Sequence, residues 1–129
     1  MITSKYSTEL ASNYHELLDT IFELESSSGK NPNAYKPNAV GALGGYQITP
    51  RTFLDLQQML PNRYRRADFK SVVSNDESAR IAANDILSIK SARLKRLGVM
   101  PTEDNLLAAY HSGEGNVLKN TLGKYGKQY

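Results

Sequence analysis

The sequence predicts a mostly α-helical protein built around one loop-rich segment. Its 129 residues are 40% hydrophobic and 22% charged, close to the average for globular domains, which argues against disorder. Apolar residues recur at helical spacing on both sides of residues 28–46, where Gly, Asn, Pro and Ala follow one another without a helical period. We therefore expect helices around a loop, or a small hairpin segment, at about residues 28–48.

The length and composition set the outer bounds. The length fits one domain, and we expect residues 1–129 to form it. No apolar run is long enough for a membrane span. The chain has no cysteine, which excludes disulfides and thiolate chemistry. Its formal net charge of +3 mildly favours polyanionic partners such as cell wall or nucleic acid and does not decide between them.

The first predicted helix runs from about Ser7 to Ser27. Its apolar positions have the spacing of a buried helical stripe, namely Leu10, Tyr14, Leu17, Leu18, Ile21 and Leu24. A second helix is expected after Thr49, because Thr49 and Pro50 fit an N-cap and a first helical residue. Pro61 should stop this helix.

Two further helices are expected in the second half of the chain. The segment Ser74–Glu77 fits a capping box that opens a long helix, and Gly98 is a natural residue to follow its end. Thr102 should cap the next helix. Gly113 and Gly115 should then interrupt it.

Three short blocks carry the chemistry. Glu25-Ser26 closes the first apolar stripe. Gly41–Pro50 reads Gly-Ala-Leu-Gly-Gly-Tyr-Gln-Ile-Thr-Pro, and its glycines suit a sharply turning backbone that lets a ligand approach closely. Ala108–Val117 reads Ala-Ala-Tyr-His-Ser-Gly-Glu-Gly-Asn-Val. In this order the blocks closely resemble the soluble lytic transglycosylases and goose-type lysozymes of glycoside hydrolase family 23, whose pattern is Glu-Ser, G-A-x-G-L-M-Q-I-x-P and A-A-Y-N-A-G-x-G-x-V.

The resemblance covers about Ile21 to Val117, with weak matching between Arg51 and Glu103. It implies a lysozyme-like fold in which the segment at about 28–48 forms one wall of a cleft. It also implies cleavage of the β-1,4 bond between MurNAc and GlcNAc in peptidoglycan. We expect no cofactor, and no metal either, because no second His or Cys stands at ligand spacing from His111.

Glu25 is the candidate catalytic residue. It falls four residues after Ile21 and seven after Leu18, so it continues the buried stripe, whereas Glu23 should face elsewhere. A carboxyl group that loses solvent beside a cleft favours its protonated form, which a general acid requires. Taken alone, Glu25-Ser26 also fits a helix-end carboxylate paired with a lysine or arginine.

Six residues are candidates for substrate binding: Ser26, Gly45, Tyr46, Gln47, Tyr110 and His111. Gln47 can donate and accept hydrogen bonds, which suits sugar hydroxyls and amides, although a surface Gln in a tight turn is the alternative. The resemblance carries the family's cleft Gln to this position. Gly45-Tyr46 stands where many members have Leu-Met, and Tyr46 either stacks on a sugar or fills the core.

The third block supplies two of these candidates. The resemblance aligns Tyr110 with the family tyrosine whose hydroxyl lies near the reacting sugar, and a core tyrosine is the alternative. His111 replaces the usual Asn and could hydrogen-bond substrate in its place.

No motif pairs another acid with Glu25, so the sequence predicts a mechanism with a single catalytic acid. Most glycosidases use two carboxylates instead. In the mechanism that the lytic transglycosylase resemblance implies, the substrate's N-acetyl carbonyl stabilises positive charge at the anomeric carbon. Glu25 protonates the leaving oxygen and then deprotonates the C6 hydroxyl of MurNAc, giving a 1,6-anhydro product. Goose-type lysozymes deliver water instead, and the sequence leaves both outcomes open.

Two other classes of function remain. The first is a nucleic-acid-binding module that uses two basic clusters, Arg63-Tyr64-Arg65-Arg66 and the basic residues from Lys90 to Arg96. The second cluster is already explained by the favourable interaction of basic residues with the negative end of a helix dipole. A catalytically inactive glycan-binding or structural protein is the other class, and Glu25 argues against it.

The expected partner is the peptidoglycan glycan strand, with no nucleic acid and no membrane span, and the expected state is a monomer. We expect the protein to act at the bacterial cell wall, in the periplasm or envelope. Because Met1–Lys5 lacks the features of a signal peptide, a phage lysin or a specialised secretion-associated enzyme is favoured.

Overall fold

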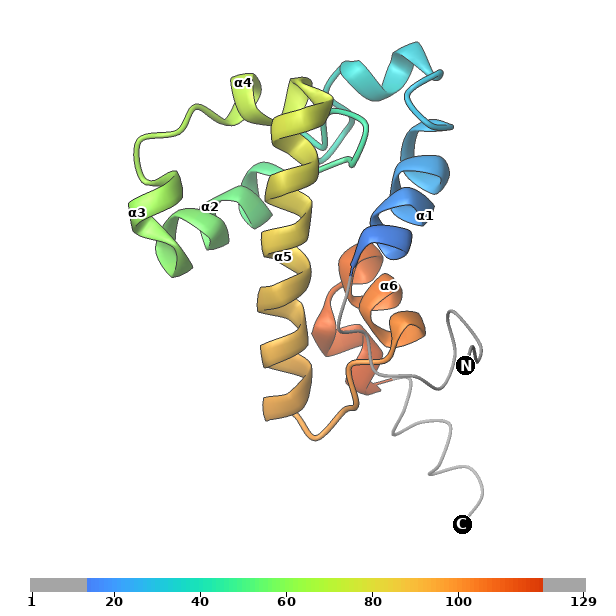
Figure 1. Cartoon of the computed structure of the whole chain (residues 1–129), viewed down its shortest axis with the longest axis vertical. Helices are drawn as coiled ribbons and strands as arrows, with labels where there is room; N and C mark the ends of the chain where they lie inside the picture. Colours follow the sequence, from blue (N-terminus) through green and yellow to red (C-terminus); the bar gives the residue numbers. More distant parts are fainter. Residues whose placement is uncertain (1–13, 120–129) are drawn as a thin grey trace. The chain divides into compact units, whose positions relative to one another are not determined.

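The protein is mostly helical, as the sequence predicts (Figure 1). The computed structural model describes residues 14–119, so residues 7–13 of the first predicted helix lie outside the described range. The elements, of which η1 is a 3₁₀-helix, are α1 (His15–Ser26), η1 (Pro32–Tyr35), α2 (Pro50–Met59), α3 (Pro61–Tyr64), α4 (Phe69–Ser74), α5 (Asp76–Arg96) and α6 (Glu103–Ser112). No β-strand forms among residues 14–119.

The chain divides into two compact units, and the boundary between them falls inside α5. The first unit is His15–Ile86, and the second consists of Met1–Tyr14 together with Leu87–Tyr129. The first unit therefore contains α1 to α4 and the start of α5, and the second contains the end of α5 and α6. That residues 1–129 form a single domain stays a prediction.

The packed face of α1 changes along the helix. The residues buried in its first half are Leu17, Leu18 and Ile21. Near its end, the ring of Phe22 stacks on Tyr46 with centroids 5.0 Å apart, and Ser26 is buried. Leu24 is 65% exposed, so the predicted stripe is wrong at this position. Phe22 and Ser26 lie four residues apart on one side of the helix, and this side, rather than that of Leu24, makes the contacts near the helix end.

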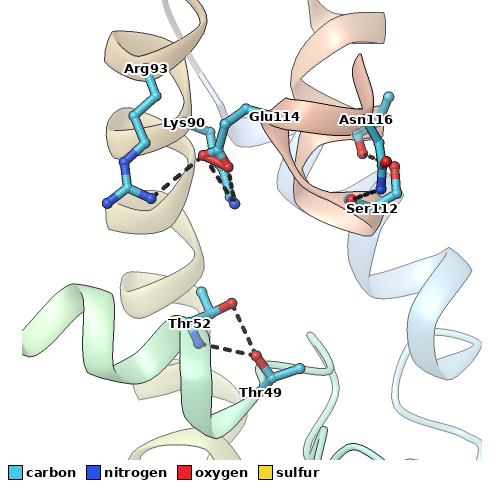
Figure 2. Close-up of polar contacts among 8 residues, drawn as sticks. Thr49, Thr52, Lys90, Arg93, Ser112, Glu114 and Asn116 are labelled. Carbon is cyan, nitrogen blue, oxygen red and sulfur yellow. Dashed lines mark hydrogen bonds and ion pairs between the residues drawn. The ribbon is translucent and has the colours of Figure 1, made fainter. Parts of the chain in front are cut away.

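The predicted start of α2 is confirmed. The side-chain oxygen of Thr49 accepts a hydrogen bond from the backbone N–H of Thr52 at 3.1 Å, and Pro50 is the first helical residue (Figure 2). α2 ends before Pro61, also as predicted, but Pro61 then opens the short helix α3. A proline at the first helical position loses no hydrogen bond, because the N–H there has no partner within the helix.

The start of α5 differs from the prediction. Ser74 is the last residue of α4, a helix that the sequence analysis did not predict, so it cannot serve as the N-cap of α5. Asn75 does so instead, because its side-chain oxygen accepts hydrogen bonds from the backbone N–H groups of Glu77 and Ser78.

The end of α5 and the start of α6 follow the prediction. Gly98 has φ +80°, and the N–H of Val99 reaches back to the carbonyl of Leu94 at 2.9 Å, closing the helix in a Schellman arrangement. Thr102 caps α6 by accepting from the N–H of Asn105 at 3.1 Å.

Only one of the two glycines expected to interrupt the chain after α6 does so. Gly113 has φ +92° and ends the helix. Residues 114–119 are helical again, so Gly115 lies inside a helical segment and the prediction for it is wrong.

Candidate functional site

Glu25 lies in the last turn of α1, where it is half-buried, while Glu23 is exposed, as the helical spacing predicts. The chain leaves this helix through a left-handed turn, with φ of 53° at Ser27, 57° at Ser28 and 80° at Gly29. Such a turn reverses the chain within a few residues and leaves the carboxyl group of Glu25 at the end of its element.

Ser26 holds this turn. Its hydroxyl donates to the carbonyl of Phe22 at 2.9 Å and accepts from the N–H of Gly29 at 3.0 Å. The carbonyl of Ser26 accepts from the N–H of Asn31 at 3.0 Å. Because Ser26 is only 1% exposed and its hydroxyl is engaged on both sides, it stabilises the turn, and that it also contacts substrate stays a prediction.

The segment at about residues 28–48 contains η1 and a small turn closed by an antiparallel bridge between Leu43 and Ile48. The glycines of this turn are buried against the protein itself. A Cβ on Gly44 would lie 1.8 Å from the carbonyl oxygen of Val73, and one on Gly45 would lie 2.3 Å from the ring of Phe22. Gly45 is therefore required for internal packing, and its role as a backbone contact for sugar stays a prediction.

Tyr46 belongs to the core of the first unit. Its ring is 3% exposed and stacks on Phe22 with an interplanar angle of 20°. Its hydroxyl accepts a hydrogen bond from Arg80 at 3.1 Å. Of the two interpretations open at the sequence level, filling the core and stacking on a sugar, the buried ring fits the first.

Gln47 is half-buried and adopts φ 50°, which is unusual for a residue other than glycine. Its side-chain N–H groups donate to the carbonyls of Ala34 at 3.0 Å and Gly44 at 2.9 Å. Its oxygen accepts one long hydrogen bond, 3.5 Å, from Asn38. The amide is thus oriented by two donors, and its oxygen retains capacity for a further donor.

Arg80 of α5 makes structural contacts that sequence reasoning missed. Its guanidinium donates to the carboxylate of Asp19 at 2.9 Å and to the backbone carbonyl of His15 at 3.0 Å, both on α1. It also donates to Tyr46 in the second block. One side chain therefore ties the helix that carries Glu25 to the turn that carries Gln47. The partners lie 34 to 65 residues away in sequence, so no local pattern signals the contact.

A second contact between residues distant in sequence joins η1 to α5. The hydroxyl of Tyr35 in η1 donates to Asp76 at the start of α5 at 2.7 Å. Partial burial, together with this hydrogen bond to a carboxylate, raises the pKa of Tyr35 to about 12. Tyr35 therefore remains a hydrogen-bond donor at neutral pH.

Tyr110 and His111 lie on α6 in the second unit. Tyr110 is half-buried and His111 is exposed. The end of α6 is braced by Ser112, whose hydroxyl donates to the carbonyl of Ala108 at 2.9 Å and whose carbonyl accepts from the side chain of Asn116 at 2.6 Å (Figure 2). That these two residues meet Glu25 stays a prediction.

A partly buried ion pair joins Glu114 of the third block to α5. Figure 2 shows the carboxylate of Glu114 between Lys90 and Arg93 of α5, at 2.8 Å and 3.5 Å. Burial alone would raise the pKa of Glu114, but the hydrogen bond from Lys90 and the positive charges of Lys90 and Arg93 hold it below its usual value of 4.5. These contacts fix the segment after Gly113 to α5.

The first unit thus assembles the first two blocks. The turn 44–47 packs on the end of α1 through Phe22, so Glu25 and Gln47 sit on elements that are joined to each other. Within residues 14–119, no group of three or more His, Cys, Asp or Glu side chains is placed to hold a metal ion. None of the helices in the same range is long and apolar enough to cross a membrane.

The mostly helical fold is consistent with that of a lysozyme-like protein. The chain matches the family model of the transglycosylase SLT domain over residues 4–129, and it belongs to that family. Members of the family are lytic transglycosylases that act on peptidoglycan in the cell wall. No curated protein and no solved structure matches the chain.

Proposed function

We propose that the protein cleaves the β-1,4 bond between MurNAc and GlcNAc in peptidoglycan, with Glu25 as its single catalytic acid and 1,6-anhydro-MurNAc as its product. The observation that carries the proposal is the family match over residues 4–129. Glu25 lies in the last turn of α1, and this helix packs on the turn of the second block through Phe22. The protein would act at the cell wall on glycan strands.

The reaction has two steps. In the first, Glu25 donates its proton to the glycosidic oxygen, the C1–O bond breaks, and the GlcNAc side leaves with a free C4 hydroxyl. The N-acetyl carbonyl of MurNAc stabilises the positive charge that develops at C1. This substrate assistance replaces the second carboxylate of most glycosidases.

In the second step, the Glu25 carboxylate accepts the proton of the C6 hydroxyl of the same MurNAc. The C6 oxygen then bonds to C1, closing the anhydro ring and regenerating the protonated acid. No water is consumed. The C6 hydroxyl has the advantage over water because it is already held within reach of C1.

The remaining candidates divide into direct and indirect contributors. Gln47 would accept a hydrogen bond from a sugar hydroxyl or the N-acetyl N–H, because its own N–H groups are committed to Ala34 and Gly44. Tyr110 would present its hydroxyl to the reacting sugar, and His111 would contact substrate in place of the family Asn. Ser26, Gly45 and Tyr46 support the turns that hold Glu25 and Gln47.

The test is digestion of purified sacculi by the wild-type chain and by Glu25→Gln, with mass spectrometry of the products. Glu25→Gln keeps the size of the side chain and removes the proton, so turnover should fall by roughly two to four orders of magnitude. Anhydro-muropeptides should dominate the wild-type products. Mainly reducing ends would show a hydrolase of the goose-type kind instead. A variant that retains more than about a tenth of wild-type turnover would contradict the assignment of Glu25.

A further inference from the structure

A basic pocket lies around α3, outside the proposed catalytic site. It has a volume of about 580 Å³ and is lined by Pro61, Asn62, Arg63, Arg65, Arg66 and Ala67. All of its charged lining residues are arginines. The pocket belongs wholly to the first unit, and Figure 1 shows α3 well apart from α1, which carries Glu25.

One of the three arginines is fixed and neutralised. Nη1 of Arg63 lies 2.9 Å and 2.7 Å from the two carboxylate oxygens of Asp85, which also accepts a hydrogen bond from the hydroxyl of Tyr64. Asp85 is 8% exposed, so this pair anchors the pocket to α5. The backbone is held as well, because the side chain of Gln57 donates to the carbonyl of Tyr64 at 3.3 Å.

The charges of the other two arginines are not neutralised by a described acid. Arg65 and Arg66 are exposed, and no described acid pairs with either of them. The pocket therefore combines a braced backbone with two uncompensated guanidinium groups. Guanidinium groups bind carboxylates and phosphates through paired N–H donors, which makes an oxyanion the chemistry that this pocket would recognise.

We propose that this pocket binds carboxylates of the peptide stems of peptidoglycan, as an accessory contact apart from the cleavage site. The inference rests on the proposed function, because peptidoglycan is then the polymer at hand and the stems carry its carboxylates. The volume is in the range of pockets that hold small molecules, which suits the end of a short peptide. A nucleic acid would need a longer basic track to neutralise successive phosphates.

The experiment measures binding without cleavage, in a Glu25→Gln background. Arg65→Gln/Arg66→Gln removes the two free charges, and Arg51→Gln/Lys95→Gln, at exposed positions elsewhere, is the charge-matched control. Each variant is titrated against intact sacculi, sacculi whose stem carboxylates are capped as methylamides, and a short DNA duplex. Because the substituted residues are exposed, circular dichroism should show all variants folded.

The pocket variant should bind intact sacculi about tenfold more weakly, while the control binds them normally. On capped sacculi the pocket variant and the control should bind alike. An equal loss on intact and capped sacculi would overturn the proposal. So would a loss confined to DNA, which would assign the pocket to nucleic acid.

Failure of this inference is distinguishable from failure of the proposed function. If the wild-type chain cleaves both kinds of sacculi through Glu25 but capping the stem carboxylates makes no difference to pocket-dependent binding, only the pocket assignment fails. If stems are bound through Arg65 and Arg66 but neither substrate is cleaved, the pocket assignment stands and the proposed reaction fails.

Discussion

The ring of Phe22 fills the space that a side chain at Gly45 would need, with its Cε1 2.3 Å from the position of a Cβ there. The family pattern has Leu at this position and Met at the next, where this chain has Gly45 and Tyr46. The aromatic pair Phe22–Tyr46 occupies this space instead. The glycine in this chain is therefore explained by its neighbour on α1.

Gly45→Ala should destabilise the protein, because the new methyl group collides with a packed ring. We expect a loss of about 1–3 kcal/mol in the free energy of unfolding, measured by urea denaturation. Gly115→Ala is the matched control, since nothing lies within 4 Å of a Cβ there and the residue is helical. It should stabilise by about 0.5–1 kcal/mol. The interpretation fails if the two substitutions act alike.

Gln47→Ala should lower both stability and activity. The substitution removes the side-chain donor from the carbonyls of Ala34 and Gly44, which keep only their backbone donors, for a loss of roughly 1 kcal/mol. Gln58→Ala, on the exposed face of α2, should change neither property. Thermal unfolding and sacculus turnover measure the two effects. Unchanged stability would argue against the bracing contacts.

Tyr110→Phe tests a hydroxyl alone, because the ring and its packing are kept. We expect kcat on peptidoglycan to fall by about ten- to a hundredfold, with Tm within a few degrees of wild type. His111→Asn, which introduces the family residue, should leave turnover close to wild type. A large loss of Tm with unchanged specific activity would place Tyr110 in the core.

Glu114→Gln should change the pH dependence of stability. The pKa of Glu114 is lower in the folded protein than in the unfolded chain, so its contribution is present above about pH 4.5 and is lost as the pH falls through the folded-state value. At neutral pH the variant should lose about 2–3 kcal/mol, because buried Lys90 is left without its carboxylate. The difference should shrink toward pH 3. Glu77→Gln, an exposed acid in the first turn of α5, should not reproduce this profile.

The elements that could be predicted from sequence are those set by local chemistry. Thr49, Gly98 and Thr102 each act on backbone groups within a few residues, so the residue types alone place these helix ends. The cap of α5 was misplaced by one residue, from Asn75 to Ser74, because α4 has only six residues and shows no helical period.

The burial of the candidate acid could be predicted from sequence, but the packing of the candidate site could not. Helical spacing indicated that Glu25 would be shielded more than Glu23, and both are so placed. The positions of Gly45 and Tyr46 depend on Phe22 and Arg80, which are distant in sequence. Local patterns do not specify such contacts, so a motif that reads as a ligand surface proved to be partly core.

The contacts of the Ser26 hydroxyl indicate which positions a motif search for related sequences should require. In the Glu-Ser pair only the first residue is suited to proton transfer, while the second closes the turn that follows it. A motif search that demands the glutamate and lets the next position vary would therefore collect chains that keep the acid but lose the turn. Requiring a small hydroxyl residue followed by a glycine three positions later would select for the architecture as well as the chemistry.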